Sequence, residues 1–303
     1  MKAVGFFCVS FLTFWCAFQG FAQRGSEPCR LDRPVVLLQE IPEGSGIAMS
    51  RRSAGVLWAH NDSGDATVFG LDTNGAIKGR VRVANAQVDD WEDLAVGPCP
   101  KGSCLYIGDI GDNSGKRQRI TVYRTPEPNP GDASTEAAEA FHAIYPDGAH
   151  DAEALFVTPE ADVFVVTKME GVVYRFPKPL RAGTTVKLER VSTVDTRNVA
   201  GPKKAAKDSR ITGAAASPDG RWVVLRTNHS LLFYQGSALM SGSAVAFRFD
   251  LAALKEPQGE GVTIGSNGVI FLIGEGGTRS KPGTLAQITC ALNRRNGEGT
   301  GGL

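Results

Sequence analysis

Short apolar runs recur along the chain, and each run is bounded by Gly, Pro, Asn or Asp. Five segments share one order: a small or acidic cluster, an apolar strand, a turn, a second apolar strand, a polar loop and a third strand. Runs this short between turn residues predict β-strands, and self-similarity at a period of about fifty residues indicates one structural unit per repeat. The five segments open at residues 43–48, 90–95, 151–156, 211–216 and 258–263.

The later strands of each repeat complete a four-stranded unit. We expect second strands at 56–60, 104–108, 162–167, 222–226 and 268–273, and third strands at 67–71, 120–124, 172–176, 231–235 and 285–290. Outer strands are expected at 80–84, 140–145, 185–191 and 245–250. The fifth repeat lacks an outer strand, but residues 35–39 at the front of the chain can supply it and close a ring.

Four-stranded antiparallel sheets repeated around an axis make a β-propeller. The sequence therefore predicts an all-β fold, a five-bladed β-propeller of four-stranded antiparallel blades closed by the N-terminal strand. A β-sandwich is a weaker alternative because it gives no reason for a motif that repeats at this period. A six-bladed propeller would need a further repeat within residues 181–210, where the sequence shows one strand and a basic loop.

The cysteines support closure of the ring. Two of the six cysteines lie in the first 22 residues, and the other four make an even number, which is typical of an oxidising compartment. Cys99 and Cys104 bracket a turn and predict a local disulfide, which leaves Cys29 to pair with Cys290. A zinc site is the weaker interpretation, because the spacings are not those of zinc-binding cysteines.

The first residues have the features of a secretory signal peptide: Lys2, an apolar run over 4–18, and a small-x-small site at 20–22. A membrane anchor is the alternative, but the run is short for a bilayer. We divide the chain into a signal peptide (1–22), a propeller domain (23–292) and a disordered tail (293–303). We expect a secreted or periplasmic protein without membrane insertion after cleavage, and the net charge of +1 suggests no nucleic-acid partner.

One position recurs at the start of each predicted innermost strand. It is occupied by Ser45, Glu92, Glu153, Thr212 beside Gly213, and Glu260. Innermost strands line the channel of a propeller, so we expect one such side chain per blade to point at the axis. Carboxylates so placed repel one another, which favours a bound cation, and Ca²⁺ suits loose oxygen ligation better than Mg²⁺. The alternative is that these acids only accept hydrogen bonds from loop amides.

The loops after the second strands gather at the same mouth, because neighbouring strands of a blade are antiparallel. Three acids on these loops are placed to orient or deprotonate water, and basic residues are placed to hold an anion. Lys168 and several basic residues between 197 and 210 add to this positive charge. The alternative is that these basic residues bind no anion and only balance the charge of the acidic residues. The predicted catalytic residues are Asp62, Asp109, Asp112, Arg117 and Arg226.

The chain resembles the calcium-activated nucleotidases, the secreted apyrases of the animal type. The resemblance rests on the order of the five channel residues and on short sequence motifs at 45–48, 90–95, 105–108 and 258–262. The resemblance implies a five-bladed propeller with one Ca²⁺ in its channel, held by one ligand from each blade. The chain departs from that family at 61–65 and 108–113, where the family has catalytic motifs. The resemblance therefore implies nucleotide hydrolysis less strongly than it implies the fold and the calcium site. The sequence motifs at 90–93 and 108–113 also resemble those of uncharacterised exported bacterial propellers.

Two functions follow. The first is a calcium-binding propeller that binds an anionic small molecule or an envelope partner through the acidic mouth of its channel. The alternative is a calcium-dependent hydrolase of a phosphate ester or nucleotide, in which the metal polarises phosphoryl oxygens. A quinone-dependent dehydrogenase is a third possibility, because some exported propellers carry such cofactors. It is a minor one, because the four histidines lack a convincing catalytic context.

Overall fold

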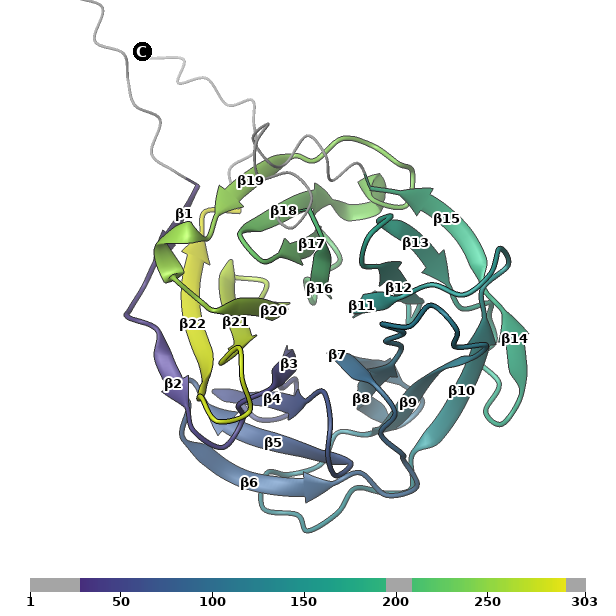
Figure 1. The fold of residues 1–303 in the computed structure, drawn as a ribbon, viewed down its shortest axis with the longest axis horizontal. Helices are drawn as coiled ribbons and strands as arrows, with labels where there is room; N and C mark the ends of the chain where they lie inside the picture. The colour runs from purple at the N-terminus through teal and green to yellow at the C-terminus, as the bar shows by residue number, and fades with distance from the viewer. Residues whose placement is uncertain (1–27, 195–208, 293–303) are drawn as a thin grey trace, which may run out of the picture.

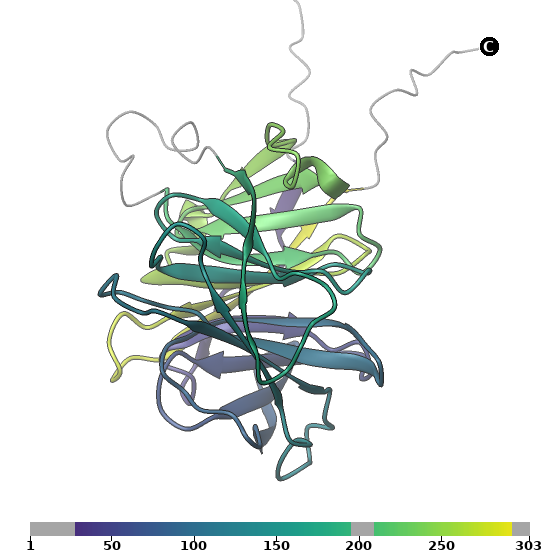
Figure 2. The same cartoon turned by 90° about the vertical axis from the view of Figure 1, so that its right-hand side faces the viewer.

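The computed structural model describes residues 28–194 and 209–292. Five antiparallel sheets stand around a central axis, and the chain visits them in sequence order (Figure 1). Seen from the side, loops leave the ring on both faces (Figure 2). The prediction of a five-bladed propeller is confirmed, and the six-bladed alternative is wrong because the five sheets formed by the described residues already close the ring.

The blades run outward from the axis in the order of their strands. Blade 1 comprises β3 (Gly44–Met49), β4 (Val56–Asn61), β5 (Thr67–Asp72) and β6 (Ile77–Arg82). Blade 2 comprises β7 (Trp91–Cys99), β8 (Gly102–Asp109), β9 (Ile120–Pro126) and β10 (Glu139–Ile144). Blade 3 comprises β11 (Ala152–Val157), β12 (Val163–Thr167), β13 (Val172–Arg175) and β15 (Glu189–Thr193). Blade 4 comprises β16 (Ile211–Ala216), β17 (Trp222–Thr227), β18 (Ser230–Gln235) and β19 (Phe247–Asp250).

Blade 5 joins the two ends of the described chain. It comprises β20 (Gln258–Ile264), β21 (Val269–Glu275) and β22 (Gly283–Cys290), and its outer strand is shared by β1 (Cys29–Leu31) and β2 (Val36–Leu38). Cys29 lies opposite Cys290 in the register and forms a disulfide with it, and Val36 lies opposite Leu285. A second disulfide joins Cys99 to Cys104. Closure by the N-terminal segment and both predicted disulfides are therefore confirmed.

The single outer strand predicted at 185–191 is wrong in detail. The segment divides at Leu188: β14 (Thr185–Lys187) pairs in parallel with β10 of blade 2, and β15 pairs with β13 of blade 3. Leu188 is buried in the core between blades 2 and 3. The open edge of β10 accepts the extra strand, and burial of Leu188 fixes the point at which the chain crosses between the blades.

The hydrophobic core is divided into five clusters, one between each pair of neighbouring blades. Trp58 of blade 1 and Trp91 of blade 2, for example, are fully buried in one cluster. Burying one large apolar side chain contributes about 1.5–3 kcal/mol, so these interfaces hold the blades in a fixed arrangement. Among the described residues no helix is long and apolar enough to cross a membrane. The signal peptide and tail predicted for 1–22 and 293–303 lie outside the described residues.

Candidate functional site

All five innermost strands are irregular at their first residues. The pairing register shifts between Gly44 and Ile47 in β3 and between Gly259 and Val262 in β20. The same shift occurs at 91–93 in β7, 152–154 in β11 and 211–213 in β16. A β-bulge turns a side chain away from the direction that regular pleating gives it. The residues left out of the pairing include the five predicted metal ligands: Ser45, Glu92, Glu153, Thr212 and Glu260.

The residue that follows each of these five is small in four blades, because the inner strands approach one another closely there. A Cβ added at Gly46 would lie 2.6 Å from the amide nitrogen of Leu94, and one at Gly213 would lie 2.7 Å from the carbonyl oxygen of Glu260. The hydroxyl groups use this proximity. Ser45 Oγ donates to the carbonyl oxygen of Glu92 over 2.6 Å, and the Thr212 hydroxyl donates to that of Glu260 over 3.2 Å.

The five predicted ligands are buried at this end of the channel. Carboxylate oxygens of Glu92, Asp151 and Glu153 all lie within 4.8 Å of one another. Ser45 Oγ is 3.4 Å from Glu92 Oε2, which adds blade 1 to the group. Burial raises the pKa of Glu92 well above its usual range, and the charges of Asp90 and Glu260 raise it further. The structure thus gathers the carboxylates of blades 2 and 3 with a hydroxyl from blade 1.

Glu260 extends the acidic group into blade 5. Burial raises the pKa of Glu260 to about 8, and the charge of Glu275 raises it as well. Among the described residues, Lys168 brings a cation to the centre: its Nζ contacts the carboxylate of Glu153 and lies 3.5 Å from Asp151 Oδ2. Among the described residues this ammonium group is outnumbered by buried carboxyl groups, and the raised pKa values of Glu92 and Glu260 mean that their full ionisation is unfavourable without a further cation.

A second acidic group lies beside the first, between blades 5 and 1. Burial raises the pKa of Asp62 to about 6, with Glu43 as the next cause, and burial raises that of Glu275 to about 7. Glu43 accepts hydrogen bonds from Ser63 Oγ over 2.7 Å and from Arg279 Nε over 2.6 Å. Asp62 Oδ1 is buried without a hydrogen-bond partner among the described residues.

Three predicted catalytic residues, Asp109 at the end of β8 and Asp112 and Arg117 in the loop after it, mainly make contacts that hold this loop in place. Asp109 accepts the Asp90 amide over 3.0 Å and Arg117 Nη2 over 2.6 Å. Asp112 accepts the amides of Lys116 over 3.0 Å and Arg117 over 2.7 Å. Arg117 Nη1 also donates to the Gly111 carbonyl over 3.0 Å. These contacts order the loop above the acidic group and occupy much of the hydrogen-bonding capacity of the three side chains.

Arg226, the other predicted anion-binding residue, lies inside the protein. Its side chain is fully buried, and Nη1 donates to the carbonyl oxygens of Gly261 over 2.8 Å and Ile273 over 2.7 Å. Nη2 contacts the buried carboxylate of Glu256. The guanidinium therefore joins blade 4 to blade 5 and has no surface exposed at the mouth. The sequence predicts that Arg226 lies on a strand. It does not predict which face of that strand packs against the neighbouring blade, so the burial of Arg226 was missed.

Asp93 is an important residue that the sequence analysis did not single out. Its carboxylate has no exposed surface and accepts amide hydrogens from three blades: Leu94 over 2.8 Å, Leu155 over 2.8 Å and Ala214 over 3.1 Å. Burial raises the pKa of Asp93, and the three amides act in the opposite direction. Because the equivalent residues of the other blades are Gly or Ala, a single carboxylate can occupy the space between the inner strands.

No protein-family model and no curated protein matches the chain. Solved structures match its fold. The PQQ-bound form of an aldose sugar dehydrogenase from Streptomyces coelicolor is similar with a TM-score of 0.50 and 10% identity, over 86% of this chain and 97% of that one. A gluconolactonase from Xanthomonas campestris is similar with a TM-score of 0.44 and 12% identity, over 86% and 95%. At such low identity the likeness shows the propeller fold alone, and the resemblance to nucleotidases stays a prediction.

Proposed function

We propose that the chain is an exported β-propeller that holds a divalent cation, with Ca²⁺ as the best fit, at the acidic mouth of its channel and binds an anionic small molecule or an envelope partner there. The observation that carries this proposal is the recurrence of the bulge. Five separate strands depart from regular pairing at the same position, and each departure includes an oxygen-bearing side chain. Bulges are common beside functional sites, where they redirect a side chain, so their recurrence at one mouth favours a site there.

The donor set fits a hard cation. Ca²⁺ binds oxygen at about 2.3–2.6 Å, so two oxygens on one ion are at most about 5 Å apart. The oxygens of Glu92, Asp151 and Glu153 lie within 4.8 Å of one another and meet this condition as they stand. Hydroxyl and carboxylate oxygens in an irregular arrangement suit Ca²⁺ better than Mg²⁺, which requires a strict octahedron. The raised pKa values of Glu92 and Glu260 support the proposal. Burial and neighbouring carboxylates disfavour the charged forms of these two groups, and a bound cation would stabilise the charged forms.

Lys168 has a place in the same proposal. Its ammonium group stands among the carboxylates that would bind the ion, so cation binding must move it away from Glu153 and Asp151. A displaced Lys168 beside a bound cation offers two positive groups to one anionic ligand. Two disulfides are consistent with an oxidising compartment, which supports the proposal of export.

Calcium titration by calorimetry tests the proposal. We expect one ion to bind to the chelator-treated chain, and Glu153→Gln to weaken binding at least tenfold, because it removes one charged ligand from the cluster. Glu160→Gln is the matched control, since Glu160 is exposed and away from the mouth. Absence of calcium binding at millimolar concentration, or equal affinity in Glu153→Gln, would reject the cation site.

The calcium-dependent hydrolase stays as a second candidate because of Asp62. Its buried, unpartnered Oδ1 and its pKa of about 6 are suited to accepting a proton from water near neutral pH. A bound cation would supply polarisation of phosphoryl oxygens. A panel of nucleotides and phosphate esters, assayed with and without chelator, separates the two functions. Turnover that is lost in Asp62→Asn but retained in Glu160→Gln supports hydrolysis, and calcium binding without turnover supports the binding function.

A further inference from the structure

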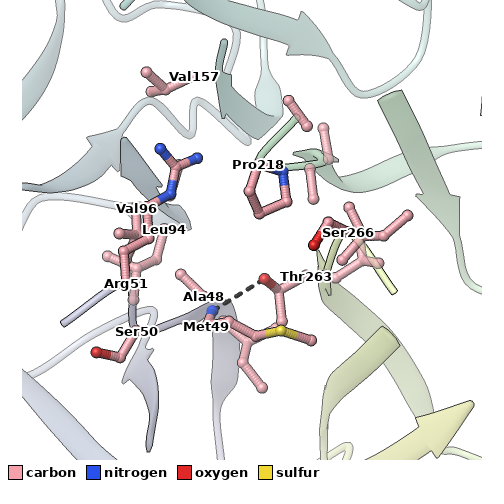
Figure 3. A pocket seen from close by; sticks show the side chains of 18 of the residues that line it. Ala48, Met49, Ser50, Arg51, Leu94, Val96, Val157, Pro218, Thr263 and Ser266 are labelled. Atoms are coloured by element: carbon pink, nitrogen blue, oxygen red, sulfur yellow. Dashed lines mark hydrogen bonds between the residues drawn. The ribbon is translucent and has the colours of Figure 1, made fainter. Parts of the chain in front are cut away.

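The opposite mouth of the channel contains a pocket of about 510 Å³. It is formed by the C-terminal halves of all five innermost strands and by the turns that follow β3, β16 and β20 (Figure 3). None of the five bulged residues lines it, so it is separate from the acidic mouth. Its volume lies within the range of about 300–1,000 Å³ that is usual for small-molecule sites.

Most of the side chains that line this pocket are apolar, and one is charged. Alanines at equivalent positions of three blades, Ala48, Ala95 and Ala215, leave room that larger side chains would fill. Among the described residues that line the pocket, Arg51 alone is charged. Figure 3 shows its side chain extending over the pocket in the direction of Val157 and Pro218. The pocket therefore combines an apolar interior with one cationic group at its edge.

The turn that carries Arg51 is held by a buried carboxylate. Glu127 accepts hydrogen bonds from the Ser50 hydroxyl, from Trp58 Nε1 over 3.0 Å, from Ser103 Oγ over 2.7 Å and from the Arg51 amide over 3.4 Å. Four donors satisfy this carboxylate without the Arg51 guanidinium. In the described part of the chain no side-chain hydrogen bond or close ion pair holds that guanidinium. Burial lowers the pKa of Arg51, and the negative charge of Glu127 acts in the opposite direction from a longer distance, so the donors of the guanidinium stay available to a ligand in the pocket.

We propose that this pocket binds a small molecule with an apolar body and a single carboxylate group. The apolar body would displace water from the wall, and Arg51 would pair with the carboxylate through two parallel hydrogen bonds. Thr263 lines the same pocket and accepts the Met49 amide over 3.0 Å, so its hydroxyl hydrogen can be donated to the ligand. A cationic or neutral molecule of the same shape would leave the guanidinium unpaired and would bind more weakly. This site does not depend on the cation at the acidic mouth.

Calorimetry with octanoate tests the proposal, with octylamine and octanol as probes of equal chain length. We expect octanoate to bind at least tenfold more tightly than either, and Arg51→Met to remove this preference. Lys101→Met is the control, because it removes an exposed charge from a residue outside the pocket. Binding of octanoate should be the same with calcium and with chelator.

A second variant tests the volume without changing charge. Ala216 lines the pocket and is half-buried, so Ala216→Trp should fill the pocket and abolish octanoate binding while Arg51 stays in place. Ser266→Trp serves the same purpose if Ala216→Trp fails to give a cooperative thermal transition. Octylamine binding as tightly as octanoate, or octanoate binding unchanged in both Arg51→Met and the folded tryptophan variant, would overturn the proposal.

Discussion

The two mouths of the channel are built from the same five strands and differ in almost every chemical respect. At the N-terminal ends of these strands, bulges bring together buried oxygen-bearing side chains; at the C-terminal ends, regular pairing leaves small apolar residues around an open pocket. The acidic mouth collects the carboxylates Glu43, Asp62, Asp90, Glu92, Asp151, Glu153, Glu260 and Glu275. In the described part of the chain, the pocket at the opposite mouth is lined by one charged residue, Arg51.

This difference shows how a repeated strand can serve two purposes. A bulge costs ladder hydrogen bonds, so it persists where the redirected side chain contributes something in return. At the other end the pairing with the second strand of each blade is regular around the pocket. The predictions below test whether the acidic mouth is a site for a ligand or only a junction between blades.

The largest expected effect is on Asp93, which joins three blades near the acidic mouth. Asp93→Leu leaves three buried amide groups without an acceptor, and each unsatisfied group costs about 1–3 kcal/mol. We expect the free energy of unfolding to fall by about 4 kcal/mol, and by less in Asp93→Asn, which keeps one acceptor oxygen. Urea denaturation measures both. Equal stability of Asp93→Leu and the unchanged chain would show that Asp93 does not hold the blades together.

Substitution of Arg226 is expected to cause the second-largest loss of stability. Arg226→Met leaves the Glu256 carboxylate buried without its partner, which should lower the free energy of unfolding by about 3 kcal/mol. The double variant Arg226→Met with Glu256→Leu should recover much of the loss, because no unpaired charge remains. Calcium affinity should be little changed in the double variant. A stable Arg226→Met that no longer binds an anionic ligand would instead return this residue to the functional site.

The acidic mouth should make stability depend on pH when no cation is present. Glu260 has a pKa of about 8 in the folded chain against an ordinary value of 4.5. Between these values the folded state keeps a proton that the unfolded state has released, so the free energy of unfolding should fall, by about 3 kcal/mol, from pH 5 to pH 8. Glu260→Gln should flatten this slope, and Glu160→Gln should not. An identical slope in Glu260→Gln would remove Glu260 as its source.

The smallest expected effect concerns Lys168. In Lys168→Met no ammonium group competes for the carboxylates of Glu153 and Asp151, so calcium should bind about tenfold more tightly, a change of about 1.4 kcal/mol. Without calcium the same variant should be less stable than the unchanged chain, because the carboxylates lose their counter-ion. Calorimetry and thermal melting with chelator measure the two changes. If the affinity falls or stays the same, Lys168 does not occupy the cation position.

The sequence predicted the repeating parts of the molecule better than the parts that occur once. The blades and the closure by Cys29 and Cys290 follow from patterns in the sequence, and the structure adds that the recurring position at the start of each inner strand lies in a bulge. Asp93 was missed because its equivalents in the other blades are Gly or Ala, so no repeat drew attention to it. Segment 185–191 was assigned to one blade because its alternation does not reveal that two different sheet edges accept it.

One ion shared by several blades is the central feature of the proposed site. A crystal structure of the chain grown with calcium tests it. We expect one density peak at about 2.3–2.6 Å from carboxylate oxygens of Glu92 and Glu153, the distance of calcium ligation, with Glu260 in or beside the coordination sphere and the Lys168 ammonium moved away. A structure in which Lys168 keeps its contact with Glu153 at saturating calcium, with no ion among these residues, would contradict the account.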